Sequence, residues 1–138
     1  MPETEEIKFS VTVIDSDPNV RSHLDHFLSE AGYAVSFESD GYAALDKLRL
    51  TPTDFVITGI LIPKLDGLAL CRLLKGDTAT EAIKVVVLSV LDTEDKALNS
   101  GADAFMKKPF ELTRLLTCLH SLNGTPKRQA LQLEESDA

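Results

Sequence analysis

The chain has 138 residues, 43 % of them hydrophobic, and carries a formal net charge of −8. This length predicts one domain whose core needs no disulfide or metal ion to hold it together. The acidic balance disfavours direct binding to nucleic acid or to anionic membranes, because both depend on clustered Lys and Arg. The longest apolar stretch, Phe55 to Ile62, is too short to span a membrane. We therefore expect a cytoplasmic protein with no direct nucleic-acid or membrane partner.

The first part of the chain predicts two strand–helix units. Val11 to Ile14 is a short apolar run that predicts a strand ending at Asp15. Asp17 followed by Pro18 is typical of a helix start, and Gly32 of a helix end. A second strand at residues 34–37 and a second helix from Asp40-Gly41 to about Leu50 complete these two units.

The same alternation continues three more times along the chain. The predicted strands are Phe55 to Thr58, Val85 to Ser89 and Ala104 to Met106. The predicted helices begin at Asp66-Gly67, at a capping box within Asp92 to Asp95, and at Glu111. The fourth helix is predicted to be short, from about Thr93 to Ser100.

Apolar strands that alternate with amphipathic helices predict an α/β fold of the doubly wound (βα)₅ type. Such a fold has a five-stranded parallel sheet with helices on both faces. The loops that leave the carboxyl ends of the strands then converge on a common pocket. We expect this domain to span residues 8–124, after an acidic leader at 1–7 and before a disordered or linker-like tail at 125–138. Cys71 and Cys118 lie in helical leucine-rich patterns and are predicted to be buried apolar side chains.

Three stretches resemble the receiver domain of bacterial two-component response regulators. They are residues 13–18 (VIDSDP), residues 54–67 (DFVITGILIPKLDG) and residues 104–110 (AFMKKPF). The resemblance covers about residues 8–123 and implies a flavodoxin-like fold and a role in phosphorelay signal transduction. It implies no enzymatic activity, and the loop from Asp15 to Asn19 has no glycines with which to cradle a flavin phosphate or dinucleotide.

Two positions depart from the receiver pattern. Receivers accept a phosphoryl group on an aspartate at the end of the third strand, beside Mg²⁺ held by an acidic pair after the first strand. Gly59 stands at the acceptor position, and the acidic pair is reduced to Asp15 followed by Ser16. Because Mg²⁺ relies on anionic oxygen ligands, we expect weak or absent binding of Mg²⁺, with Asp15 as a weak candidate ligand, and no other cofactor.

Other switch positions match the family. The resemblance implies that Ser89 is the hydroxyl that senses the phosphoryl group, Lys108 the lysine that pairs with it, and Phe105 the aromatic switch. Lys108-Pro109 matches a lysine and cis-proline pair. We expect Lys108 to pair with Asp15 and to hold the loops in one arrangement without phosphate.

Neighbouring polar residues have simpler explanations than a substitute acceptor. Asp54 precedes the third strand and is predicted at the opposite edge of the sheet, while Thr58 is predicted to point to the other face. Asp17 and Asp66 are predicted to be helix N-caps. A glycine at position 59 could also serve a turn.

These observations favour an atypical receiver that acts by phosphorylation-independent interaction with a signalling protein: a histidine kinase, a regulator or a localisation factor. One alternative is a dimerisation or regulatory module of a longer signalling protein, including a homodimer. Another is phosphotransfer through an unconventional residue, Ser16 or Ser89. The short fourth helix alters a face that receivers commonly use for partners, so the sequence leaves the partner and its interface open.

Overall fold

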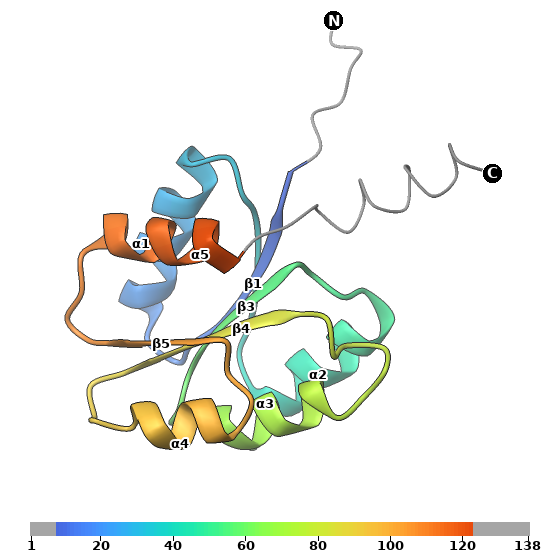
Figure 1. Cartoon of the computed structure of the whole chain (residues 1–138). Helices are drawn as coiled ribbons and strands as arrows, with labels where there is room; N and C mark the ends of the chain where they lie inside the picture. Colours follow the sequence, from blue (N-terminus) through green and yellow to red (C-terminus); the bar gives the residue numbers. More distant parts are fainter. Residues whose placement is uncertain (1–7, 123–138) are drawn as a thin grey trace, which may run out of the picture.

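The computed structural model describes residues 8–122, which form a parallel sheet with helices on both faces (Figure 1). The five strands are β1 (Ser10–Ile14), β2 (Ala34–Glu38), β3 (Phe55–Gly59), β4 (Lys84–Ser89) and β5 (Ala104–Lys107). The five helices are α1 (Pro18–Glu30), α2 (Gly41–Leu50), α3 (Gly67–Lys75), α4 (Glu94–Asn99) and α5 (Leu112–Leu122). The doubly wound (βα)₅ fold predicted from the sequence is confirmed. The predicted leader at 1–7, residues 123–124 and the predicted tail at 125–138 lie outside the described residues.

The order of the strands is β2-β1-β3-β4-β5, and every neighbouring pair is parallel. All five residues of β3 are buried, and β4 is buried after its first residue. Their sequences are mainly apolar because helices cover both faces of the sheet. The edge strand β2 is only partly buried. None of the helices within residues 8–122 is long and apolar enough to cross a membrane.

Two hydrophobic layers hold the helices to the sheet. On one face, α1 and α5 pack their buried leucines against the side chains of β1, β3 and β4 that point toward them. On the other face lie α2, α3 and α4 (Figure 1), with buried leucines from α2 and α3 and Ala97 from α4 in the hydrophobic layer. Each fully buried leucine contributes roughly 1.5–3 kcal/mol relative to an exposed one. This two-sided burial fixes the strand ends, and hence the loops that follow them.

Three helices begin with an aspartate cap. Asp17 accepts a hydrogen bond from the amide of Asn19, and Asp40 and Asp66 accept one from the amide three residues ahead. The predicted caps at Asp17 and Asp66 are therefore confirmed, and Asp40 serves the same role. Each cap satisfies an amide that otherwise has no partner within the helix.

The fourth helix starts differently. Its N-cap is Thr93, whose side chain makes no capping hydrogen bond. The predicted capping box at Asp92 to Asp95 is therefore wrong. The physical reason is the backbone: Thr93 has φ −122° and ψ 24°, whereas the three aspartate caps have the extended conformation. The Thr93 hydroxyl instead donates to the carbonyl oxygen of Leu91 at 3.4 Å.

Candidate functional site

The carboxyl ends of the strands surround a cavity of about 210 Å³. It lies where β1 and β3 are neighbours, which is the switch point of the doubly wound sheet. Five of the predicted site residues line it: Asp15, Ser16, Gly59, Ser89 and Lys108. They come from four loops or strand ends between residues 15 and 108, so only the folded sheet brings them together.

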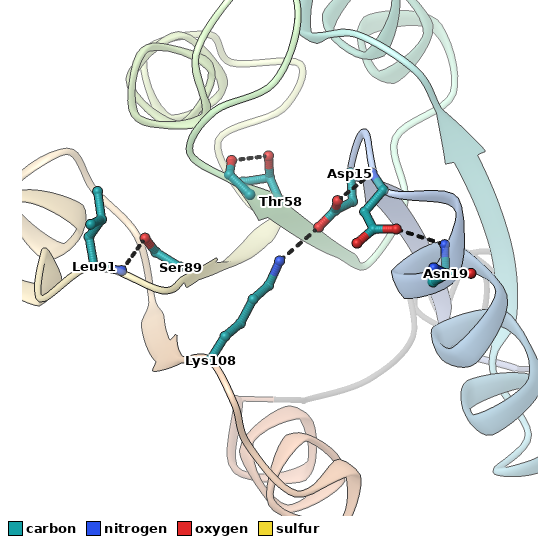
Figure 2. A network of polar contacts seen from close by, with 8 residues as sticks. Asp15, Asn19, Thr58, Ser89, Leu91 and Lys108 are labelled. Atoms are coloured by element: carbon teal, nitrogen blue, oxygen red, sulfur yellow. Dashed lines mark hydrogen bonds and ion pairs between the residues drawn. The ribbon is translucent and has the colours of Figure 1, made fainter.

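Both carboxylate oxygens of Asp15 have a partner in the structure, and only 7 % of the residue's surface is exposed. Its Oδ1 accepts a hydrogen bond from the amide of Asp17 at 2.9 Å. Its Oδ2 lies 3.2 Å from Nζ of Lys108, which follows β5 (Figure 2). The predicted ion pair is therefore present. It ties the first loop of the chain to the last and leaves both charges neutralised within the cavity.

Gly59 is the last residue of β3 and pairs with Leu88 in the sheet register. A Cβ atom at this position would lie 3.6 Å from Oδ2 of Asp15 and 3.8 Å from Cγ2 of Ile62, both ordinary van der Waals distances. The glycines with positive φ among residues 8–122 are Gly32 and Gly101. Neither a turn conformation nor a lack of space therefore accounts for glycine at position 59.

Gly67, at the start of α3, has a clear structural reason to be glycine. Its amide donates to the carbonyl oxygen of Ile60 at 2.8 Å. A Cβ atom there would collide with the carbonyl oxygen of Gly59. The backbone after β3 thus packs directly on the first turn of α3, which explains the Asp66-Gly67 pair in physical terms.

Ser89, the last residue of β4, is buried and uses its side chain locally. Its Oγ accepts a hydrogen bond from the amide of Leu91 at 3.0 Å, as Figure 2 shows. Its carbonyl oxygen accepts from the amide of Lys108 at 2.7 Å. The hydroxyl of Ser89 thereby shapes the loop from β4 to α4.

Neither of the two neighbouring polar residues points toward the cavity. Thr58 pairs in register with Ile14, and its buried hydroxyl donates to the carbonyl oxygen of Gly59 at 2.8 Å. Asp54 precedes β3 at the amino edge of the sheet, where it accepts hydrogen bonds from the amide and hydroxyl of Ser10. Both were predicted to be unable to replace an acceptor at position 59, and their positions agree with that prediction.

Two other predicted residues lie outside this cavity. Phe105 and Pro109 line a separate cavity of about 660 Å³, together with residues from α4 and α5. Phe105 is half-buried and packs against the hydrophobic layer on the α2–α3 side. The peptide bond between Lys108 and Pro109 is cis. The structure thus divides the seven predicted positions into five around the first cavity and two beside the second.

The donor set of the first cavity does not fit Mg²⁺. Its carboxylates are Asp15, which is paired with Lys108, and Asp17, whose Oδ1 caps α1. Across residues 8–122 no three His, Cys, Asp or Glu side chains come close enough to share a metal ion. Mg²⁺ demands octahedral oxygen ligands and gives up its water reluctantly, so two carboxylates that already have partners, with a serine between them, are a poor site.

Sequence reasoning missed three apolar residues at the mouth of this cavity. Leu61 follows β3, and Val90 and Leu91 follow β4. Their exposed fractions are 81 %, 66 % and 51 %. The sequence did contain a signal, since apolar residues continue beyond the predicted ends of both strands. We call these three residues the apolar rim.

Comparison with known proteins identifies the family. Residues 11–120 match the response regulator receiver domain. The chain belongs to this family. The receiver is 35 % identical over 115 residues to the response regulator MprA of Mycobacterium tuberculosis, which covers 81 % of the chain and 49 % of MprA. It is 30 % identical over 127 residues to the response regulator ArlR of Staphylococcus epidermidis, covering 90 % of the chain and 57 % of ArlR. The chain thus spans about half the length of these relatives.

Solved structures agree with this assignment. The receiver resembles the receiver domain of a signal transduction histidine kinase from Syntrophus aciditrophicus, with a TM-score of 0.77 and 33 % sequence identity. The match covers 83 % of this chain and 89 % of that one. Receiver domains are signalling modules rather than typical enzymes, and they interact with histidine kinases. The fold and the coarse role of the chain in two-component signalling follow from this membership.

Proposed function

We propose that this receiver is atypical and acts without accepting a phosphoryl group. The observation that carries the proposal is Gly59 at the end of β3, where a Cβ atom would make only ordinary contacts beside Asp15 but no side chain is present. An acyl phosphate requires a carboxylate, and the resemblance implies an aspartate at this position. With Ser16 in place of the second acidic residue, the cavity also offers a poor site for the Mg²⁺ that assists the transfer.

The contacts that Lys108 and Ser89 make within the receiver support the same proposal. Lys108 pairs with Asp15, and Ser89 accepts from the amide of Leu91. The first contact links the loops after β1 and β5, and the second shapes the loop after β4. The receiver therefore holds one arrangement of its loops by its own side chains and presents a constant surface to a partner.

Phosphotransfer through an unconventional residue has less support. Ser16 lines the cavity, but a serine hydroxyl needs a general base, and the nearby Asp15 carboxylate is bound to Lys108. Ser89 is buried and its oxygen is already hydrogen-bonded. Neither residue could form an acyl phosphate.

The proposed partner is a signalling protein in the cytoplasm: a histidine kinase, another regulator or a localisation factor. The acidic balance of the chain argues against nucleic acid or membrane as a direct partner. Because the match covers only 49 % of MprA and 57 % of ArlR, a regulatory or dimerisation module of a longer protein is the second candidate. Light scattering of the purified chain tests it, since a dimer would favour that candidate.

The main proposal is tested by intact-mass spectrometry after incubation with acetyl phosphate and Mg²⁺. We expect no mass increase, whereas the double variant Gly59→Asp with Ser16→Asp should gain one phosphoryl group, because position 59 has room for a side chain. A stoichiometric aspartyl phosphate on the unmodified chain would overturn the proposal. A phosphoserine located by peptide mapping would favour the unconventional route instead.

A further inference from the structure

Apolar side chains gather at the mouth of the cavity without a partner in the fold. Seven large apolar side chains are exposed within residues 8–122, and three of them are Leu61, Val90 and Leu91, the apolar rim. They come from two different loops, and none belongs to either hydrophobic layer of the core. Single exposed apolar residues are ordinary, but a group around a concave site marks an interaction surface.

Gly59 lines the cavity behind the rim without contributing a side chain. Its missing side chain leaves space beside Oδ2 of Asp15, while the ion pair with Lys108 satisfies the charges on the floor. Figure 2 shows Leu91 and Asp15 on opposite sides of this site. A side chain from another molecule that contacts the rim at the mouth of the cavity would therefore lie next to Ser89 and Lys108, which also line the cavity.

Charge decides what kind of segment fits the rim. Leu91 is followed by three exposed acidic residues, Asp92, Glu94 and Asp95, and Asp17 is exposed on the other side of the cavity. Four lysines lie near the rim: Lys108 is paired with Asp15, Lys107 lies 2.8 Å from Asp92, and Lys64 lies 3.7 Å from Asp40, while Lys96 is exposed on α4. The surroundings of the rim are thus predominantly acidic.

This charge argues against a second copy of the chain as the occupant. Two rims facing each other would bring the same acidic residues together, and each chain carries a net charge of −8. Like charges that face each other at an interface suppress association. A partner with Lys or Arg next to its apolar side chains has the complementary charge, and the aliphatic parts of those basic residues add to the apolar contact.

We propose that the loops after β3 and β4 form a docking surface for a basic, amphipathic segment of a partner protein. Its apolar side chains contact Leu61, Val90 and Leu91, and one of them enters the space left by Gly59. Its Lys or Arg side chains face Asp17 and the acidic start of α4. This inference rests on the proposed function, because an occupied cavity leaves no place for a phosphoryl group.

The test uses the full chain and a defined probe, a fluorescein-labelled amphipathic peptide of leucine and lysine. Fluorescence anisotropy at physiological ionic strength measures its affinity for the receiver. We expect the double variant Leu61→Asn with Leu91→Asn to bind at least about tenfold more weakly. Gly59→Asn, which fills the cavity without adding charge, should also weaken binding.

Two controls accompany this measurement. Leu50→Asn removes a leucine that is 87 % exposed at the end of α2, at the amino edge of the sheet, and should leave the affinity unchanged. The matching peptide of leucine and glutamate should not bind. Because the substituted leucines are exposed, circular dichroism should show the same fold for each of these variants.

Several results would contradict the proposed docking surface or the basic character of its partner. The inference is overturned if the unmodified chain does not bind the lysine peptide, if the rim variant binds as tightly as the unmodified chain, or if Leu50→Asn loses as much affinity as the rim variant. Equal binding of the glutamate peptide overturns the basic partner. Phosphorylation by acetyl phosphate is measured separately, so a phosphorylated chain overturns the proposed function, whereas an unphosphorylated chain without rim binding overturns the docking surface alone.

Discussion

Gly59, at the end of β3, and Gly67, at the start of α3, are glycine for different physical reasons, although the sequence shows only the same residue type. Gly67 is required by a close approach of two backbone segments, since a Cβ atom would meet the carbonyl oxygen of Gly59. Gly59 itself has no such requirement. Its presence at the end of β3 is therefore a chemical feature of the site and not a consequence of packing.

Alanine substitutions separate these two cases. We expect Gly67→Ala to lower the free energy of unfolding by about 2 kcal/mol or more, because backbone must move to admit the methyl group. Gly59→Ala should change it by less than about 1 kcal/mol, since its methyl group meets only ordinary contacts. Urea denaturation measures both. Equal losses in the two variants would show that position 59 is also packed too tightly for a side chain.

The two cysteines differ in how far they can react. Burial raises the pKa of the Cys71 thiol to about 11, and its side chain has no exposed surface. Burial also raises the pKa of Cys118, which is partly exposed. Below the pKa the thiolate fraction falls tenfold per pH unit, so at about pH 8.5 little of Cys71 is in the reactive form.

We therefore expect iodoacetamide to modify Cys118 well before Cys71 in the native protein. Peptide mapping after timed alkylation gives the two rates, and the protein unfolded in urea serves as the control, in which both thiols should react. If Cys71 were alkylated as fast as Cys118 under native conditions, its burial in the layer beneath α3 would be wrong.

Among the helices of residues 8–122, α4 is the one that we expect to be least stable. It has six residues, and its first turn has no side-chain cap, whereas α3 has nine residues and the cap of Asp66. A short helix has few backbone hydrogen bonds to offset the conformational entropy lost in forming its first turn. Without a side-chain cap it also lacks one further stabilising hydrogen bond. The residues before α4 carry part of the apolar rim, so a loosely held helix start lies beside the proposed docking surface.

Hydrogen exchange tests the stability of α4. We expect its amides to exchange at least about tenfold faster than those of α3, because local opening there breaks fewer contacts. Exchange followed by mass spectrometry resolves the two helices, and α3 is the internal reference. Equal protection would mean that packing through Ala97 compensates for the short length and the missing cap.

At the scale of the whole molecule, ligand binding should appear as a change in thermal stability. A ligand that binds only the folded chain stabilises it by RT ln(1 + [L]/Kd) and so raises its melting temperature. We expect about 10 mM Mg²⁺ to leave the melting temperature of the unmodified receiver unchanged, since of the two carboxylates of the cavity Asp15 is paired with Lys108 and Asp17 caps α1.

The double variant Gly59→Asp with Ser16→Asp is the matched comparison, and Mg²⁺ should raise its melting temperature. Differential scanning fluorimetry with and without EDTA measures both proteins. An increase of several degrees in the unmodified chain would show that Asp15 and its neighbours hold a divalent cation after all. That result would remove one support of the proposed function, although the absence of an acceptor at position 59 would stand.

The sequence alone determined the order of the elements and the chemistry at the strand ends. Apolar runs, helix periodicity and the Asp17 and Asp66 caps are local features, and local features persist in the fold. The identity of Gly59 and Ser16 is likewise visible without coordinates. The capping box before α4 failed because its backbone conformation depends on the loop from β4, which no short pattern encodes.

Only the tertiary structure decided which of these residues share a site. The contact between Lys108 and Asp15 joins positions 93 residues apart, and the separation of Phe105 and Pro109 from the cavity depends on how α4 and α5 pack on the sheet. The space beside Gly59 and the exposure of Leu61, Val90 and Leu91 were also decided there. The physical reason is that distances and exposure depend on packing between distant segments, whereas strand and helix patterns depend on neighbours in the chain.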